Sequence, residues 1–191
     1  MDVNTIAWLI LLLPLTSAAV ILLGTKKSAG ISALIATGSA IATLVLSLLL
    51  LTQPDTAAAK PLSWLSIGDF QVNIGLKLDS LAQGMMIITG ALYYDKDGSG
   101  IGTLVHIFSL GYMEKDAGKA RFFAGLSLFM FSMTGIVLAD NFAMMFIFWE
   151  LVGVSSYILI GHWYDKDSAA DAAKKAFLVN RIGDFGFMIG I

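Results

Sequence analysis

The sequence NFAMMFIFWELVGVSSYILIG, residues 141–161, decides the fold of this chain. A hydrocarbon core about 30 Å thick requires about 20 apolar residues in a helix, so this stretch predicts a membrane span. One carboxylate, Glu150, falls near its middle. A charge at the centre of a spanning helix costs about 2.5–3.5 kcal/mol on insertion scales, and such residues usually face a protein interior or a water-filled path. Glu150 is therefore the first candidate functional residue, as a proton relay, with a structural polar tie between helices as the alternative.

The composition of the whole chain is also that of a membrane protein. Of 191 residues, 57% are hydrophobic and 14% charged, whereas soluble domains are about 25% charged. The apolar residues form long blocks, which predicts a polytopic helical membrane protein in a lipid bilayer. A net charge of −2 argues against a nucleic-acid partner, and the absence of cysteine excludes thiolate-bound metal or iron–sulfur sites. No phosphate loop or metal-ligand cluster stands out, so we expect no cofactor bound by this chain.

The expected fold class is an all-α polytopic membrane protein with about six transmembrane helices and a short β-hairpin between the second and third. Between the hydrophobic blocks lie polar connections, and the last block stops before any cap or turn, so we expect the chain to be a fragment. The six expected spans are residues 5–23, 29–51, 80–113, 122–138, 141–161 and, cut short, 176–191.

The hairpin is expected within residues 62–78. From Phe70 onward apolar and polar residues alternate, and Gly68-Asp69 separates two short runs. This pattern is typical of two short strands joined by a tight turn. An irregular loop at the membrane surface is the alternative.

The third span is interrupted by the polar sequence ALYYDKDGSG, residues 91–100. Because non-helical backbone cannot face lipid, these residues must loop out, shift the helix or contact protein. Asp95, Asp97 and Ser99 match the first half of a calcium-binding loop, but the twelfth position is His106 and not the expected glutamate. A polar turn or an inserted segment explains the pattern equally well.

Lysine and arginine predict the orientation through the positive-inside rule. Lys60 and Lys77 lie on one side of the expected membrane, which places the N-terminus and the hairpin in the periplasm of a bacterial inner membrane. The loops on the opposite, cytoplasmic side contain Lys26, Lys27, Lys115, Lys119, Arg121, Lys166, Lys174 and Lys175.

Three further residues are candidates for charge or proton transfer. Arg181 and Asp184 are spaced i and i+3 in the last span, so they share a helix face. They form either a local pair near the membrane surface or a charge chain leading to Glu150. His106 lies in the third span, where it serves as a proton relay or as a hydrogen-bonded packing residue. Asp79 is placed to cap the third helix.

Several motifs together resemble a known family. They are LKLDSLAQGMMIITG with IGTLVHIFSLGYMEKD, LADNFAMMFIFWELVGVSSYILIGHW, and AAKKAFLVNRIGDFGFMIGI. The chain resembles the N-terminal part of the antiporter-like L subunits of the proton-pumping NADH–quinone oxidoreductase, respiratory complex I. The large subunit of Mrp-type sodium/proton antiporters is also similar. The resemblance covers residues 62–191, and residues 149–161 and 180–184 are its most specific parts.

The resemblance implies roles for individual residues. Glu150 matches the family's glutamate of the fifth helix, which is taken to pair with a lysine of a later helix. Arg181 and Asp184 match a charged pair of the sixth helix, and His106 matches a histidine of the third. Because the implied lysine would lie beyond Ile191, we expect Glu150 to lack its cation in this chain.

The resemblance also implies an enzyme subunit without a redox site of its own. NADH, flavin, iron–sulfur clusters and quinone are expected in partner subunits, and the direct partners are other membrane subunits, especially a neighbouring antiporter-like subunit. An Mrp-type antiporter and a membrane scaffold without an ion path remain alternatives. The expected divisions are 1–61 (first two helices), 62–78 (hairpin), 79–121 (interrupted helix and loop) and 122–191 (start of the proton-translocating domain).

Overall fold

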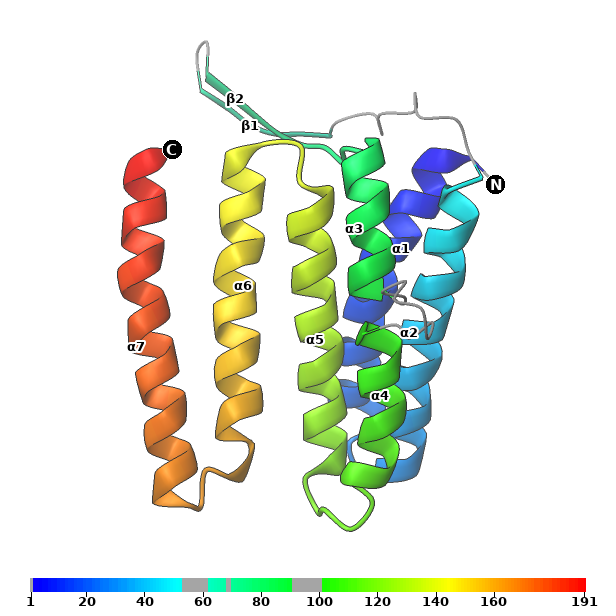
Figure 1. Ribbon diagram of the computed structural model, residues 1–191, viewed down its shortest axis with the longest axis vertical. Helices are drawn as coiled ribbons and strands as arrows, with labels where there is room; N and C mark the ends of the chain where they lie inside the picture. The colour runs from blue at the N-terminus through cyan, green and yellow to red at the C-terminus, as the bar shows by residue number, and fades with distance from the viewer. Residues whose placement is uncertain (1, 53–61, 68–69, 91–100) are drawn as a thin grey trace.

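The computed structural model describes residues 2–52, 62–67, 70–90 and 101–191. Within them the helices stand side by side, and a two-stranded sheet lies at one end (Figure 1). The helices are α1 (Val3–Val20, continued by a π-helical turn Ile21–Thr25), α2 (Ala29–Leu50), α3 (Ser80–Gly90), α4 (Ile101–Tyr112), α5 (Lys119–Leu138), α6 (Phe142–Ile160) and α7 (Asp167–Gly190); the strands are β1 (Leu62–Ile67) and β2 (Phe70–Ile74).

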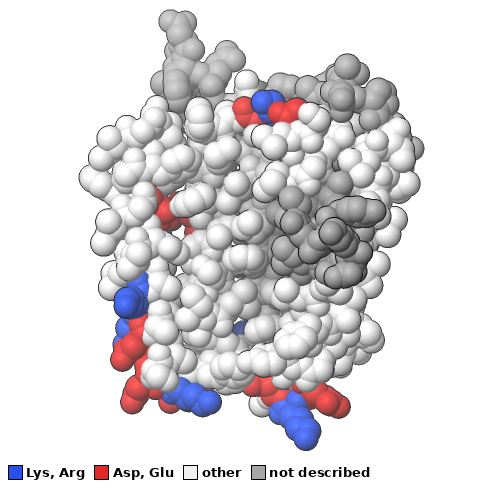
Figure 2. Space-filling model, viewed as in Figure 1, with Lys and Arg blue, Asp and Glu red and all other residues white. Residues whose placement is uncertain are grey.

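The protein is a multi-pass helical membrane protein. In the described part of the chain, four helical segments are long and apolar enough to cross a bilayer. Figure 2 shows the matching surface, on which the charged residues gather at the two ends and the middle band is almost entirely uncharged. The four segments are Val3–Thr25, Ala29–Leu50, Lys119–Leu138 and Phe142–Trp163.

The expected third span consists of two helices, on either side of the predicted interruption. The described residues contain seven α-helices, so the count of about six transmembrane helices is not confirmed. With 11 and 12 residues, α3 and α4 are each only about 17 Å long at 1.5 Å per residue, too short to cross 30 Å alone. Both pack against α2, one after the other (Figure 1). The interruption itself, residues 91–100, lies outside the described residues. Asp79 accepts a 2.7 Å hydrogen bond from the Ala82 amide, which confirms it as the cap of α3.

The last helix begins before the apolar span that the sequence predicted. α7 starts at Asp167, nine residues before the expected start of the span. The reason is that its first turns, DSAADAAKK, are rich in alanine, the residue with the highest helix propensity. α7 therefore has a polar beginning at one end of the bundle and an apolar remainder that runs alongside α6 (Figure 1).

Two antiparallel strands are present where the alternating pattern predicted them. Leu62 lies opposite Ile74 and Ile67 opposite Phe70, and the register shifts by one residue between Ser63 and Leu65. The turn between them, residues 68–69, is not among the described residues. The chain leaving β2 is held against the connection between α5 and α6. There the amide of Lys77 donates to the Leu138 carbonyl at 2.9 Å, and the Asn141 side chain donates to the Asn73 carbonyl at 2.7 Å.

α5 lies at the centre of the bundle, in contact with α1, α2 and α6 (Figure 1). Alanine allows α2 to pack closely, and Ala36 and Ala40 are fully buried. The hydroxyl of Ser17 on α1 donates to that of Ser127 on α5 at 2.8 Å. Because α5 stands between α4 and α6, it separates the candidate residues of the third expected span from those of the fifth.

Candidate functional site: an intramembrane charge cluster

Glu150 lies midway along α6, about 12 Å along the axis from the first residue of the helix at 1.5 Å per residue. Asn141 fixes where the helix starts, because its side-chain oxygen accepts a 2.9 Å hydrogen bond from the Met144 amide. This is the usual chemistry of a helix N-cap. The local sequence thus places the carboxylate deep in the apolar band, as expected.

Arg181 of α7 connects two carboxylates. Its guanidinium donates to Glu150 across the α6–α7 interface, and it lies 3.8 Å from the Asp184 carboxylate on its own helix. The implied lysine beyond Ile191 stays a prediction, but within this chain Arg181 supplies a cation to Glu150. The long arginine side chain reaches the neighbouring helix, which the i, i+3 spacing alone did not reveal. The local pair and the link to Glu150 are both present.

Asp184 is the most deeply buried member of the cluster, with 4% of its surface exposed. The indole Nε1 of Trp149 donates to it at 2.9 Å. A buried carboxylate needs such partners, because burying a charge without them is very costly. Sequence reasoning missed Trp149; the available signal was an indole N–H next to Glu150, in an apolar helix where it needs an acceptor.

The cluster opens into a groove between α6 and α7. The cavity volume is about 740 Å³, and the side chains of Glu150 and Arg181 are 23% and 46% exposed. On the side of these two helices a small red area interrupts the uncharged band (Figure 2). Apolar side chains complete the groove: Phe146, Leu178, Ile182, Phe185 and Met188.

His106 lies apart from this cluster. It is on α4, with 2% of its surface exposed, and α5 stands between α4 and α6 (Figure 1). The structure thus brings together Glu150, Arg181 and Asp184 but not His106. Asp95, Asp97 and Ser99 lie outside the described residues, so the calcium-loop hypothesis stays a prediction.

A second polar cluster, missed in the sequence, joins the α4–α5 and α6–α7 connections. Asp116 accepts hydrogen bonds from the Trp163 indole at 2.7 Å and the Gly118 amide at 2.6 Å, and the buried His162 ring nitrogen is 3.2 Å away. The Trp163 hydrogen bond is the main cause that lowers the pKa of Asp116 below its ordinary value. The four residues come from segments more than 40 positions apart, so no local pattern indicated them.

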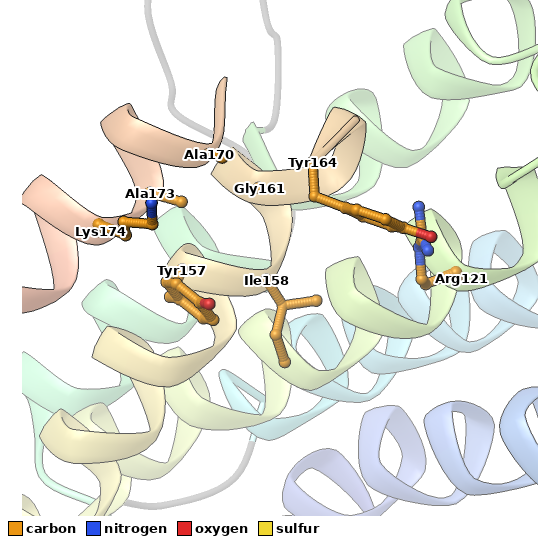
Figure 3. Close-up of a pocket in the computed structure, with 8 residues that line it drawn as sticks. All are labelled: Arg121, Tyr157, Ile158, Gly161, Tyr164, Ala170, Ala173 and Lys174. Atoms are coloured by element: carbon orange, nitrogen blue, oxygen red, sulfur yellow. The ribbon is translucent and has the colours of Figure 1, made fainter. Parts of the chain in front are cut away.

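Figure 3 shows the small pocket next to this second cluster, about 260 Å³ in volume. Arg121 of α5 points toward the ring of Tyr164, 4.9 Å from its centroid, and donates to the His162 carbonyl at 2.7 Å. These contacts tie the end of α6 to the beginning of α5. Because α6 holds Glu150, they help to fix the position of the charge cluster.

Two protein-family models match this chain, and together they include most of the residues described above. Residues 64–123 match the family described as NADH-ubiquinone oxidoreductase (complex I), chain 5 N-terminus. Residues 139–191, which contain Glu150, Arg181 and Asp184, match the NADH:quinone oxidoreductase/Mrp antiporter transmembrane family. The chain belongs to the antiporter-like membrane subunits of NADH–quinone oxidoreductase.

Curated members of this family are similar over nearly the whole chain. NADH-quinone oxidoreductase subunit L of Mycobacterium tuberculosis (strain H37Rv) is 38% identical over 191 residues, which is 96% of this chain and 29% of that protein. NAD(P)H-quinone oxidoreductase chain 5 of Synechocystis is 41% identical over 196 residues, covering 97% and 28%. The chain thus spans less than a third of the length of these relatives.

Among solved structures, one chain of the archaeal membrane-bound sulfane sulfur reductase, a respiratory membrane complex, has a similar fold. The TM-score is 0.71 at 17% identity, covering 97% of this chain and 36% of that chain. At this identity the likeness concerns the arrangement of the helices alone.

Proposed function

We propose that this chain belongs to a proton-translocating membrane subunit of NADH–quinone oxidoreductase, and that Glu150, Arg181 and Asp184 form part of its proton path. The observation that carries the proposal is the cluster itself: two carboxylates share one guanidinium, in the middle of the apolar band, in a chain of this family. Oxidation of NADH and reduction of quinone belong to other subunits, which hold the flavin, the iron–sulfur clusters and the quinone site.

The geometry supports a mechanism of alternating ion pairs. Arg181 contacts Glu150 and is 3.8 Å from Asp184, so a small side-chain movement exchanges its partner. At about 4 Å, the Coulomb energy of an ion pair is about 4 kcal/mol at an effective dielectric constant near 20. Solvent exposure of the two side chains reduces the net value. When Arg181 pairs with Glu150, Asp184 loses most of its interaction with the guanidinium; when Arg181 turns to Asp184, Glu150 loses its cation. A change of charge on a neighbouring helix or subunit would bias this choice.

The proposal includes the orientation of the helix bundle in the membrane. The connections that follow α1, α4 and α6 lie at one end of the bundle, and the β-hairpin and the N-terminus lie at the other (Figure 1). Those three connections and the first turns of α7 hold most of the lysines, which favours the cytoplasmic side of a bacterial inner membrane for that end. The hairpin would then face the periplasm. We propose a neighbouring antiporter-like subunit as the main partner.

A sodium/proton antiporter of the Mrp type is the second candidate, because the family matched by residues 139–191 includes both. In that case ion movement would respond to a sodium gradient without NADH. A scaffold without an ion path is the third.

The test places Glu150→Gln in the full-length subunit of the assembled complex, reconstituted in liposomes. We expect fewer protons pumped per NADH oxidised, while the matched variant Glu114→Gln, at an exposed position in the α4–α5 connection, pumps normally. Unchanged pumping in Glu150→Gln would refute the proton path and support the scaffold. Transport driven by sodium without NADH would favour the antiporter.

A further inference from the structure

Unpartnered polar atoms gather on one pair of helices away from the charge cluster. Among the described residues, five buried side-chain polar atoms have no hydrogen-bond partner, and four of them are on α2 and α4. They are the hydroxyl oxygens of Thr37, Ser39 and Thr43 and the Nε2 atom of His106. Thr43 is completely buried and His106 is 2% exposed.

Three of these residues, Thr37, Thr43 and His106, are spaced one helical turn from a contact between the two helices. The Thr103 hydroxyl of α4 donates to the Ala40 carbonyl of α2 at 3.3 Å. Thr37 and Thr43 are each three residues from Ala40, and His106 is three residues from Thr103. At 1.5 Å per residue Thr37, Thr43 and His106 lie about 4.5 Å along the helix axes from this contact, and the i, i+3 spacing places them on the same side of their helices as the contact.

The hydroxyls of Thr37, Ser39 and Thr43 differ from other buried hydroxyls in the described residues, including Ser47 on the same helix, which donates to the Thr43 carbonyl. Serine and threonine in helices commonly donate to a carbonyl one turn earlier, as Ser132 does to Leu128 and Thr134 to Phe131. Thr37, Ser39 and Thr43 make no such bond. An unsatisfied buried polar group costs about 1–3 kcal/mol, so four together would cost a large share of the roughly 5–15 kcal/mol that stabilises a typical domain.

The Nε2 atom of His106 needs a hydrogen-bond donor. Its Nδ1 lies 2.8 Å from the Gly102 carbonyl, which can only accept, so Nδ1 holds the hydrogen. In the neutral ring Nε2 is then an acceptor and needs a donor. A water molecule can donate to Nε2 and accept from a threonine or serine hydroxyl at the same time, which satisfies both kinds of group.

We propose that the α2–α4 interface is an internal water site, in which at least one water molecule bridges Nε2 of His106 and the hydroxyls of Thr37 and Thr43. The site is polar and offers several partners, the conditions under which buried water is stable. It lies on the opposite side of α5 from Glu150, and it gives His106 a hydrated contact within the membrane that does not depend on the charge cluster.

The direct test is a density map of the complete assembled complex at a resolution that shows water. We expect a peak about 2.7–3.2 Å from Nε2 of His106 and within the same range of at least one α2 hydroxyl. The proposal is wrong if the side chains close on one another without a peak. It is also wrong if a protein group donates to Nε2, or if the peak is a metal ion bound by oxygens alone.

A pair of variants tests the same site through stability. Thr43→Val keeps the volume but removes the hydroxyl, whereas Thr43→Ser keeps the hydroxyl. If water is bound, Thr43→Val lowers the melting temperature of the assembled complex and weakens the water peak, and Thr43→Ser retains the peak. If the interface is dry, removing an unsatisfied hydroxyl relieves its cost, so Thr43→Val raises the melting temperature and the proposal fails.

Discussion

The pair between Glu150 and Arg181 allows a quantitative prediction, tested by a double-mutant cycle of Glu150→Gln, Arg181→Gln and the double variant. An ion pair at about 4 Å is worth about 4 kcal/mol at an effective dielectric constant near 20. The two side chains are 23% and 46% exposed, and Arg181 is shared with Asp184. Both facts reduce the value, and we expect a coupling free energy of about 1–2 kcal/mol.

The single variants should also differ from each other. Arg181→Gln leaves two carboxylates without a cation, so it should lower the free energy of unfolding more than Glu150→Gln does. The double variant should be more stable than the sum of the single effects predicts, because removing Glu150 relieves part of the repulsion left by the loss of Arg181. Unfolding of the full-length subunit by denaturant in detergent micelles measures all four proteins.

An exposed pair serves as the matched control. Lys174 and Asp171 on the same helix are 3.3 Å apart and 68% and 76% exposed, so their cycle should give no more than about 0.5 kcal/mol. Effects for Glu150 and Arg181 that add within about 0.3–0.5 kcal/mol, the range for independent sites, would contradict the proposed alternation of ion pairs.

Three further predictions follow from other contacts. Trp149→Phe keeps the aromatic ring but removes the donor to Asp184, and should lower the free energy of unfolding by about 1.5–3 kcal/mol, measured by the same denaturant assay. The pKa of Asp116 is lowered in the folded protein. The ionised Asp116 carboxylate therefore stabilises the fold fully above its unfolded pKa, near 3.8, and this stabilisation is lost as the pH falls through the folded pKa. Melting temperatures measured from pH 6 to pH 3 should fall less in Asp116→Asn than in the unchanged protein. Gly135→Ala places a methyl group in the phenylalanine ring of α6 and should lower the melting temperature, whereas Gly183→Ala, with no atom within 4 Å, should leave it unchanged or higher.

Much of the fold was predictable because lipid imposes simple rules on sequence. The length of the apolar blocks identified α1, α2, α5 and α6, and the alternation after Phe70 identified the strands. The expected span from residue 176 did not give the start of α7, because a polar, alanine-rich segment can be a helix without being a membrane span. The interruption at residues 91–100 was visible in the sequence, but hydropathy alone does not say whether an interrupted span remains one helix or, as here, forms two.

The sequence by itself determined that Glu150 is a costly charge in the middle of a span, and that Arg181 and Asp184 share a helix face. These conclusions depend on period and composition, which are local. Only the tertiary structure decided that Arg181 reaches Glu150, that Trp149 donates to Asp184, and that α5 separates His106 from them. Such contacts depend on which faces of neighbouring helices meet, and that is set by the packing of many side chains together and by no single stretch of the chain.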